Sequence, residues 1–207
     1  MKFSRTRLGA AAAVAFSAAA LPANAVMVYV LDQTVTSGLN APFGTVTLTQ
    51  NGANEVDVSV ALNSGFKFVK TGGPHDAFTF NVDVSGYNVG GVVSNLYADV
   101  KPGSNPAFGS YTDALVCASC RNGGSGAFAS TLTFAVTDAT GISESNFVAN
   151  HLGFTFSADL IATATGVTGA VANGNLIAPP VPEPETYALM LAGLGALGFV
   201  ARRRKQA

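Results

Sequence analysis

The sequence of 207 residues contains no tryptophan, two cysteines, two histidines and few charged residues, 11% in all. So few cysteines and histidines leave little material for a zinc site, which needs about four ligands, and we predict neither a metal nor another cofactor. The sparse charge excludes a disordered, highly charged chain. The near balance of 11 basic and 12 acidic residues excludes a generally basic nucleic-acid-binding protein.

Apolar residues make up 48% of the sequence, the mean hydropathy is +0.35, and much of this apolar character lies at the two ends. The N-terminal end carries the positive residues Lys2, Arg5 and Arg7. An alanine-rich apolar run over 8–20 and the small residues Ala23 and Ala25 follow, which is the pattern of a secretory signal peptide. We therefore predict a signal peptide over 1–25 and a mature chain that starts at Val26.

The C-terminal end shows three features in a fixed order. A proline-rich stretch over 178–186 precedes an apolar run over 187–201, which is somewhat short against the roughly 20 residues of a membrane span. A basic cluster then follows, formed by Arg202, Arg203, Arg204 and Lys205. Since basic clusters stay on the cytoplasmic side, we predict one C-terminal transmembrane helix that holds the protein temporarily, with the rest of the chain outside the cytoplasm.

The residues Val181-Pro182-Glu183-Pro184-Glu185, the apolar run and the terminal basic cluster together resemble a PEP-CTERM sorting signal. The resemblance covers 179–205 and implies an exosortase substrate of a Gram-negative bacterium, processed at or near Pro182, Glu183 and Pro184. The implied partners are exosortase, the secretion machinery and, transiently, the inner membrane. The body is then expected first in the periplasm and later at the cell surface or outside the cell.

Without both ends, the body over 26–178 carries four basic and ten acidic residues, a net charge of −6. Apolar and polar residues alternate along it, which is typical of half-buried antiparallel strands. The alternating runs cover 45–49, 55–62, 66–68, 78–84, 132–136 and 154–156. Turn residues separate these runs, so we predict an all-β, jelly-roll-like antiparallel β-sandwich between the signal peptide (1–25) and the sorting signal (179–207).

Two segments of the body depart from this alternation. Ser143 to Asn150 is a candidate short helix with Ser143 as its cap. The stretch from Lys101 to Gly126 is rich in Gly, Ser, Asn and Pro, and we expect a long surface excursion there.

The two cysteines, Cys117 and Cys120, form a C-x-x-C motif. An oxidising compartment outside the cytoplasm favours a structural disulfide between them, which would pin the excursion. Free thiols and a redox or metal role are the alternatives.

His75 and Asp76 are adjacent after a glycine-rich turn, and such a pair is either an acid–base or metal site or, more simply, a turn in which Asp accepts backbone hydrogen bonds. Tyr87, Tyr97 and Tyr111 are candidate platforms for sugar rings, or ordinary residues at the rim of the core.

Threonines recur on alternate positions in two runs. Their positions are Thr45, Thr47 and Thr49 in one run, and Thr131 and Thr133 in the other. Regular threonine rows can match ice, but threonine is also a good solvent-facing strand residue, and one short row makes no flat array.

No catalytic motif with its required context occurs, so we predict a non-catalytic protein of the cell envelope or extracellular matrix. The main alternative is a polysaccharide-binding module with an exopolysaccharide as partner. An ice-binding protein and a hydrolase are less favoured.

Overall fold

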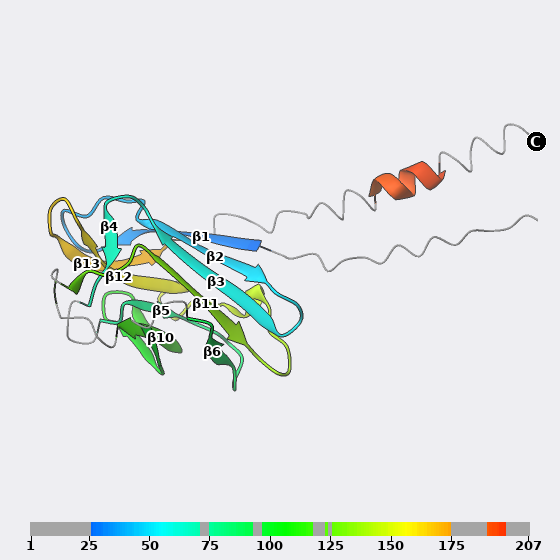
Figure 1. Ribbon diagram of the computed structural model, residues 1–207, viewed down its shortest axis with the longest axis horizontal. Helices are drawn as coiled ribbons and strands as arrows, with labels where there is room; N and C mark the ends of the chain where they lie inside the picture. Colours follow the sequence, from blue (N-terminus) through cyan, green and yellow to red (C-terminus); the bar gives the residue numbers. More distant parts are fainter. Residues whose placement is uncertain are drawn as a thin grey trace, which may run out of the picture.

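The computed structural model describes residues 26–70, 75–92, 97–117, 123, 126–174 and 190–197 (Figure 1). The elements of the body are β1 (Val26–Thr34), β2 (Gly44–Gln50), β3 (Glu55–Leu62), β4 (Phe66–Phe68), β5 (Phe78–Phe80), β6 (Asn88–Gly90), β7 (Tyr97–Val100), β8 (Gly103–Asn105), β9 (Gly109–Tyr111), β10 (Asp113–Cys117), β11 (Thr131–Thr137), the 3-10 helix η2 (Glu144–Asn146), β12 (Phe156–Ala162) and β13 (Thr168–Asn173).

Most of the alternating runs form strands as predicted, but 81–84 and 154–155 lie outside β5 and β12. In β3, the side chains of Val56, Val58 and Val60 are buried, whereas the residues between them face the solvent. The same alternation runs through β2 and β11. β-Branched and aromatic side chains suit such half-buried strands, so here local propensity and burial agree. The predicted all-β antiparallel class is confirmed.

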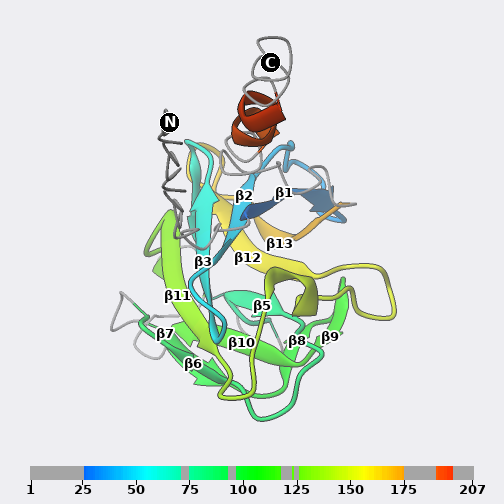
Figure 2. The ribbon, with the colours of Figure 1, turned by 90° about the vertical axis from the view of Figure 1, so that its right-hand side faces the viewer.

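The described strands form one continuous sheet in the order β6-β11-β3-β2-β1-β13-β12-β5-β10-β7, with β4 paired to β12, and a separate β8–β9 hairpin. The sheet curls over, so the two layers expected of a sandwich are two parts of one half-barrel (Figure 2). The register between β1 and β13 shifts between Leu31 and Gln33. Such a bulge bends a strand and lets the hydrogen-bonded ladder continue around the curve.

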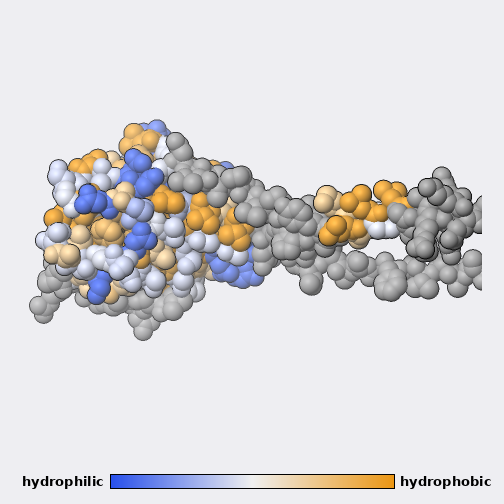
Figure 3. Space-filling view, turned by 90° about the horizontal axis from the view of Figure 1, so that it is seen from above, coloured by the Kyte–Doolittle hydropathy of each residue, from blue (hydrophilic) through white to orange (hydrophobic). Residues whose placement is uncertain are grey.

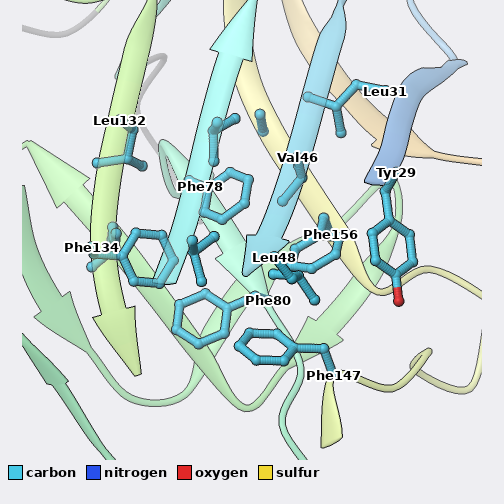
Figure 4. Packing of buried hydrophobic residues seen from close by; sticks show 14 of the residues in the cluster. Tyr29, Leu31, Val46, Leu48, Phe78, Phe80, Leu132, Phe134, Phe147 and Phe156 are labelled. Carbon is cyan, nitrogen blue, oxygen red and sulfur yellow. The ribbon is translucent and has the colours of Figure 1, made fainter. Parts of the chain in front are cut away.

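The core lies inside this curl and is rich in phenylalanine (Figure 4). The ring of Phe134 on β11 lies 6.1 Å from that of Phe78 and 5.2 Å from that of Phe80, both on β5. Since β11 and β5 stand far apart in the strand order, these contacts show that the two parts of the sheet face each other. Phe156 on β12 also packs on Tyr29 of β1, with ring centroids 4.9 Å apart.

The expected surface excursion from Lys101 to Gly126 is wrong for most of its described residues. It contains β8, β9 and β10, and β10 pairs with both β5 and β7. Leu115 in β10 is fully buried. Because β10 is short and four of its five residues are buried, its sequence has no alternation by which it can be recognised.

The expected helix from Ser143 to Asn150 is also wrong, since only the 3-10 turn η2 forms. The Asn146 side chain accepts a hydrogen bond from the Ser143 amide (2.8 Å) and closes this turn. The chain then becomes extended at Phe147, which forms a bridge with Val82 and packs its ring on Phe80 and Phe156. Burial of the Phe147 ring therefore outweighs continuation of the helix.

Residues 190–197 form a helix with exposed apolar side chains, whereas hydrophobic and hydrophilic residues are interspersed on the body (Figure 3). No helix among the described residues has the length and apolar character needed to cross a membrane. The predicted signal peptide and most of the predicted sorting signal lie outside the described residues.

Candidate functional site

In strands β1, β2, β3 and β11, every other side chain points into the core. The side chains between them point away from the core, and we call the surface that they form the outer face. Directly opposed residues form rows across it, such as Val28, Thr47, Ser59 and Thr133. Its twelve members are Val26, Val28, Val30, Thr45, Thr47, Thr49, Asp57, Ser59, Ala61, Thr131, Thr133 and Ala135. The two threonine runs thus share one face with β3 between them, and Asp57 is the one charged member of the twelve.

A pocket of about 590 Å³ lies at one end of the outer face, and we call it the amide pocket. Its polar lining comes from Asn51, Asn54, Glu55, Asn88, Thr137 and Asp138, with two alanines completing it. The lining residues come from three separate stretches of the chain. Glu55, Thr137 and Asn88 are directly opposed on β3, β11 and β6, so the sheet register itself brings them together.

Backbone hydrogen bonds fix the two turns that border the amide pocket. The β2–β3 turn includes Gly52 at φ +77°, a left-handed conformation that favours glycine. The Asp138 amide donates to the Asn54 carbonyl (3.0 Å), and the Ile142 amide donates to the Ala53 carbonyl (3.1 Å). These hydrogen bonds hold the loop after β11 against the β2–β3 turn. The backbone that borders the pocket is therefore fixed.

The amide pocket is acidic. The Asp138 carboxylate accepts hydrogen bonds from the Thr140 amide (2.7 Å) and hydroxyl (2.6 Å), which hold the pKa of Asp138 below its usual value. Glu55 accepts a hydrogen bond from the Asn51 amide group (2.7 Å), which also reaches Asp57 (3.2 Å). None of the residues that line the pocket is basic. The pocket thus offers carboxylate, amide and hydroxyl groups without a compensating cation.

A second cluster of ionisable groups surrounds Asp113, which is fully buried. Burial and a hydrogen bond with Asp99 raise the pKa of Asp113 to about 7. The Lys101 ammonium lies 3.3 Å from the Asp113 carboxylate and 3.9 Å from the centre of the Tyr87 ring. Because Asp113 has no exposed surface, a dissolved substrate has no access to it, and the cluster is structural.

Two of the three tyrosines proposed as sugar platforms are buried, so that interpretation of them is wrong. Tyr87 and Tyr111 are 7% and 3% exposed, and burial raises the pKa of each to about 12. The sequence reads them as exposed because the strands that cover them are short and irregular. The side chain of Tyr97, at the start of β7, lies outside the described residues.

Asp76 makes hydrogen bonds through both its carboxylate and its backbone amide. Its carboxylate accepts a hydrogen bond from the Ser104 amide (2.8 Å), and its own amide donates to the Ser104 carbonyl (3.2 Å). These bonds join it to β8, far along the chain. Partial burial raises the pKa of Asp76 above its usual value. Among the described residues, no group of three or more His, Cys, Asp or Glu side chains is placed to hold a metal. His75 therefore belongs to no such group.

Residues 180–205 match the family model of the PEP-CTERM protein-sorting motif. The chain carries a PEP-CTERM sorting motif. The resemblance found in the sequence is confirmed, and the motif marks an exported protein that exosortase recognises. No curated protein and no solved structure matches the chain.

The predicted processing residues of the PEP-CTERM motif, Pro182, Glu183 and Pro184, lie outside the described residues, as does the basic cluster over 202–205. At the other end, Ala23 and Ala25 also lie outside them, and Val26 is the first described residue of β1. Cys117 is disulfide-bonded, and its predicted partner Cys120 falls in an undescribed stretch. The processing position at Pro182–Pro184, the cleavage after Ala25 and the pairing of Cys117 with Cys120 stay predictions.

The amide pocket is the functional candidate that the sequence did not reveal. Its polar residues are spread from Asn51 to Asp138, and each is an ordinary turn or strand-end residue when taken alone. Only the register of β3, β11 and β6 assembles them, and no motif in the sequence encodes that register.

Proposed function

We propose that this exported protein is a non-catalytic component of the cell envelope or extracellular matrix, delivered by two cleavable signals. The single observation that carries the proposal is the PEP-CTERM motif at 180–205. Its apolar segment holds the precursor at the membrane, and its basic end stays in the cytoplasm while the body folds on the far side. Exosortase then processes the chain near Pro182–Pro184, and the chain from Val26 to that position remains as the mature protein.

The geometry of the body supports presentation rather than catalysis. Asp113, the carboxyl with a pKa near neutrality, is fully buried beside Lys101. A general acid must reach the proton acceptor on its substrate, and Asp113 has no exposed surface. The outer face consists mainly of small, uncharged side chains, which suits a surface exposed outside the cell.

Intact-mass spectrometry of the protein isolated from the producing cells tests this proposal. We expect a mature form that starts at Val26 and lacks everything after Pro182–Pro184. Replacing Glu183 with Ala is expected to leave the C-terminal segment attached, whereas Glu185→Ala, just outside the Pro-Glu-Pro sequence, serves as the matched control. A mature wild-type form that retains Arg202–Lys205 would contradict the proposal and indicate a permanently anchored protein.

A further inference from the structure

The amide pocket is an open hollow whose volume is sufficient for a small ligand. Its volume of about 590 Å³ falls within the range of small-molecule sites in proteins, roughly 300–1,000 Å³. Beside it, two residues along the β11–β6 ladder from the opposed pair Thr137 and Asn88, Ala135 stands opposite Gly90. A Cβ placed on Gly90 would meet no atom within 4 Å, so the surface beside the pocket is open. A chain molecule therefore has room to continue from the pocket onto the outer face.

The polar groups of the pocket match a polyhydroxylated ligand. Each sugar hydroxyl both donates and accepts a hydrogen bond. Amide groups and the Thr137 hydroxyl do the same, and carboxylates accept. Asn54 and Asn88 are both exposed. Within the described part of the chain, no protein group forms a hydrogen bond with the side-chain amide of either residue. Two amides are thus available to a ligand in a frame that the turns hold rigid.

The charge of the site also limits the classes of ligand that it can bind. Glu55, Asp57 and Asp138 give the site a negative potential, and none of the residues lining the pocket is basic. Polyanions such as acidic polysaccharides or nucleic acids are repelled by such a site. Among the described residues, no three His, Cys, Asp or Glu side chains are placed to hold a divalent cation.

We infer that the amide pocket binds a sugar unit of a neutral polysaccharide. Asn54 and Asn88 hydrogen-bond its hydroxyls, Glu55 and Asp138 accept from them, and the polymer continues along the outer face. Hydrogen bonds then replace the tyrosine stacking that burial of Tyr87 and Tyr111 rules out. This inference concerns the body alone and does not depend on how the C-terminal end is processed.

Affinity electrophoresis of the detergent-solubilised full chain tests the inference, since this form exists whether or not sorting occurs. Gels containing the neutral polymers dextran, laminarin or galactomannan are compared with gels containing alginate, and with gels containing calcium chloride alone. We expect retardation by at least one neutral polymer. The double variant Asn54→Ala/Asn88→Ala is expected to raise the dissociation constant about tenfold, because two hydrogen bonds are lost.

The matched control is Gln33→Ala, which removes an exposed amide outside the pocket and is expected to leave retardation unchanged. Thermal unfolding of each variant checks that the fold is intact. Absence of retardation by all three neutral polymers would overturn the inference. Equal retardation of wild type and double variant would do so too, as would binding to alginate alone or a mobility change caused by calcium alone.

Discussion

The body contains two parts that are built differently. Strands β1, β2, β3 and β11 have 7 to 9 residues each, whereas β5, β7, β8, β9 and β10 have 3 to 5. We call them the long-stranded part and the short-stranded part. The long-stranded part combines extended backbone ladders with strictly alternating burial. Its outer side chains are small, and few of them form hydrogen bonds with other segments.

The short-stranded part depends instead on side chains that bond to the backbone of neighbouring segments. Asn81 accepts a hydrogen bond from the Thr112 amide (2.8 Å), and Thr112 in turn accepts one from the Val82 amide (2.9 Å). Asp76 holds Ser104 in the same manner. Gly103 lies so close to the Asp113 carbonyl that a side chain at this position would clash. Short ladders have few backbone bonds, so polar side chains supply the remaining order.

The largest expected effect comes from Phe134, whose ring joins the two parts. Phe134→Ala removes its contacts with Phe78 and Phe80 and is expected to lower the free energy of unfolding by about 3–5 kcal/mol. Urea denaturation provides the measurement. Thr133→Ala, on the same strand but exposed, is the control and is expected to change stability by less than about 0.5 kcal/mol. Similar losses in both variants would mean that the two parts are not joined through this ring.

An intermediate effect is expected from the side chains that order the short-stranded part. Asn81→Ala leaves the Thr112 amide without its acceptor, and we expect a loss of about 2 kcal/mol in the free energy of unfolding. Asn88→Ala, which removes an exposed amide, is the matched control and should cost less than about 0.5 kcal/mol. Chemical denaturation of both variants decides the question. Equal stability of the two variants would mean that the Asn81 amide contributes no more to the fold than the exposed Asn88 amide.

The smallest expected effect is a pH dependence due to Asp113. Its pKa in the folded state, about 7, exceeds the usual 3.8, so the folded state retains this proton longer than the unfolded state. The stabilisation is therefore complete below pH 3.8 and is lost as the pH rises through 7. We expect wild type to lose more stability between these limits than Asp113→Asn, which has no ionisable group at this position.

Urea denaturation across the pH series measures this difference. The raised pKa of Asp76 gives a slope of the same sign, but it is present in both proteins and cancels in the comparison. Asp57→Asn, which changes an exposed carboxylate on β3, serves as the control variant. A slope that Asp113→Asn leaves intact would show that Asp113 is not its source.

The sequence predicts the long-stranded part well because its strands are half-buried. A solvent face and a core face impose a period of two, which is visible at Val56, Val58 and Val60 and again in β11. In β10 four of the five residues are buried, so this period disappears from its sequence. Phe147 illustrates a second limit, because its position depends on rings that come from β5 and β12.

The same division applies to the candidate sites. A sorting signal is read along the chain, as contiguous proline, apolar and basic segments, so the sequence alone identified the PEP-CTERM motif. A pocket is assembled across the chain, and residues 51–55, 88 and 137–139 meet only because β3, β11 and β6 pair in one register. The burial of Tyr87 and Tyr111 was decided in the same way, by segments packed on them.

The sequence by itself determined the sorting signal of this protein, its all-β class and its longest strands. Each of these depends on residues that are neighbours along the chain. The tertiary structure alone decided the curl of the sheet, the joining of the threonine runs on one face and the amide pocket. These features depend on side chains that are distant in sequence, and on the core packing of Phe78, Phe80 and Phe134 that brings the two parts together.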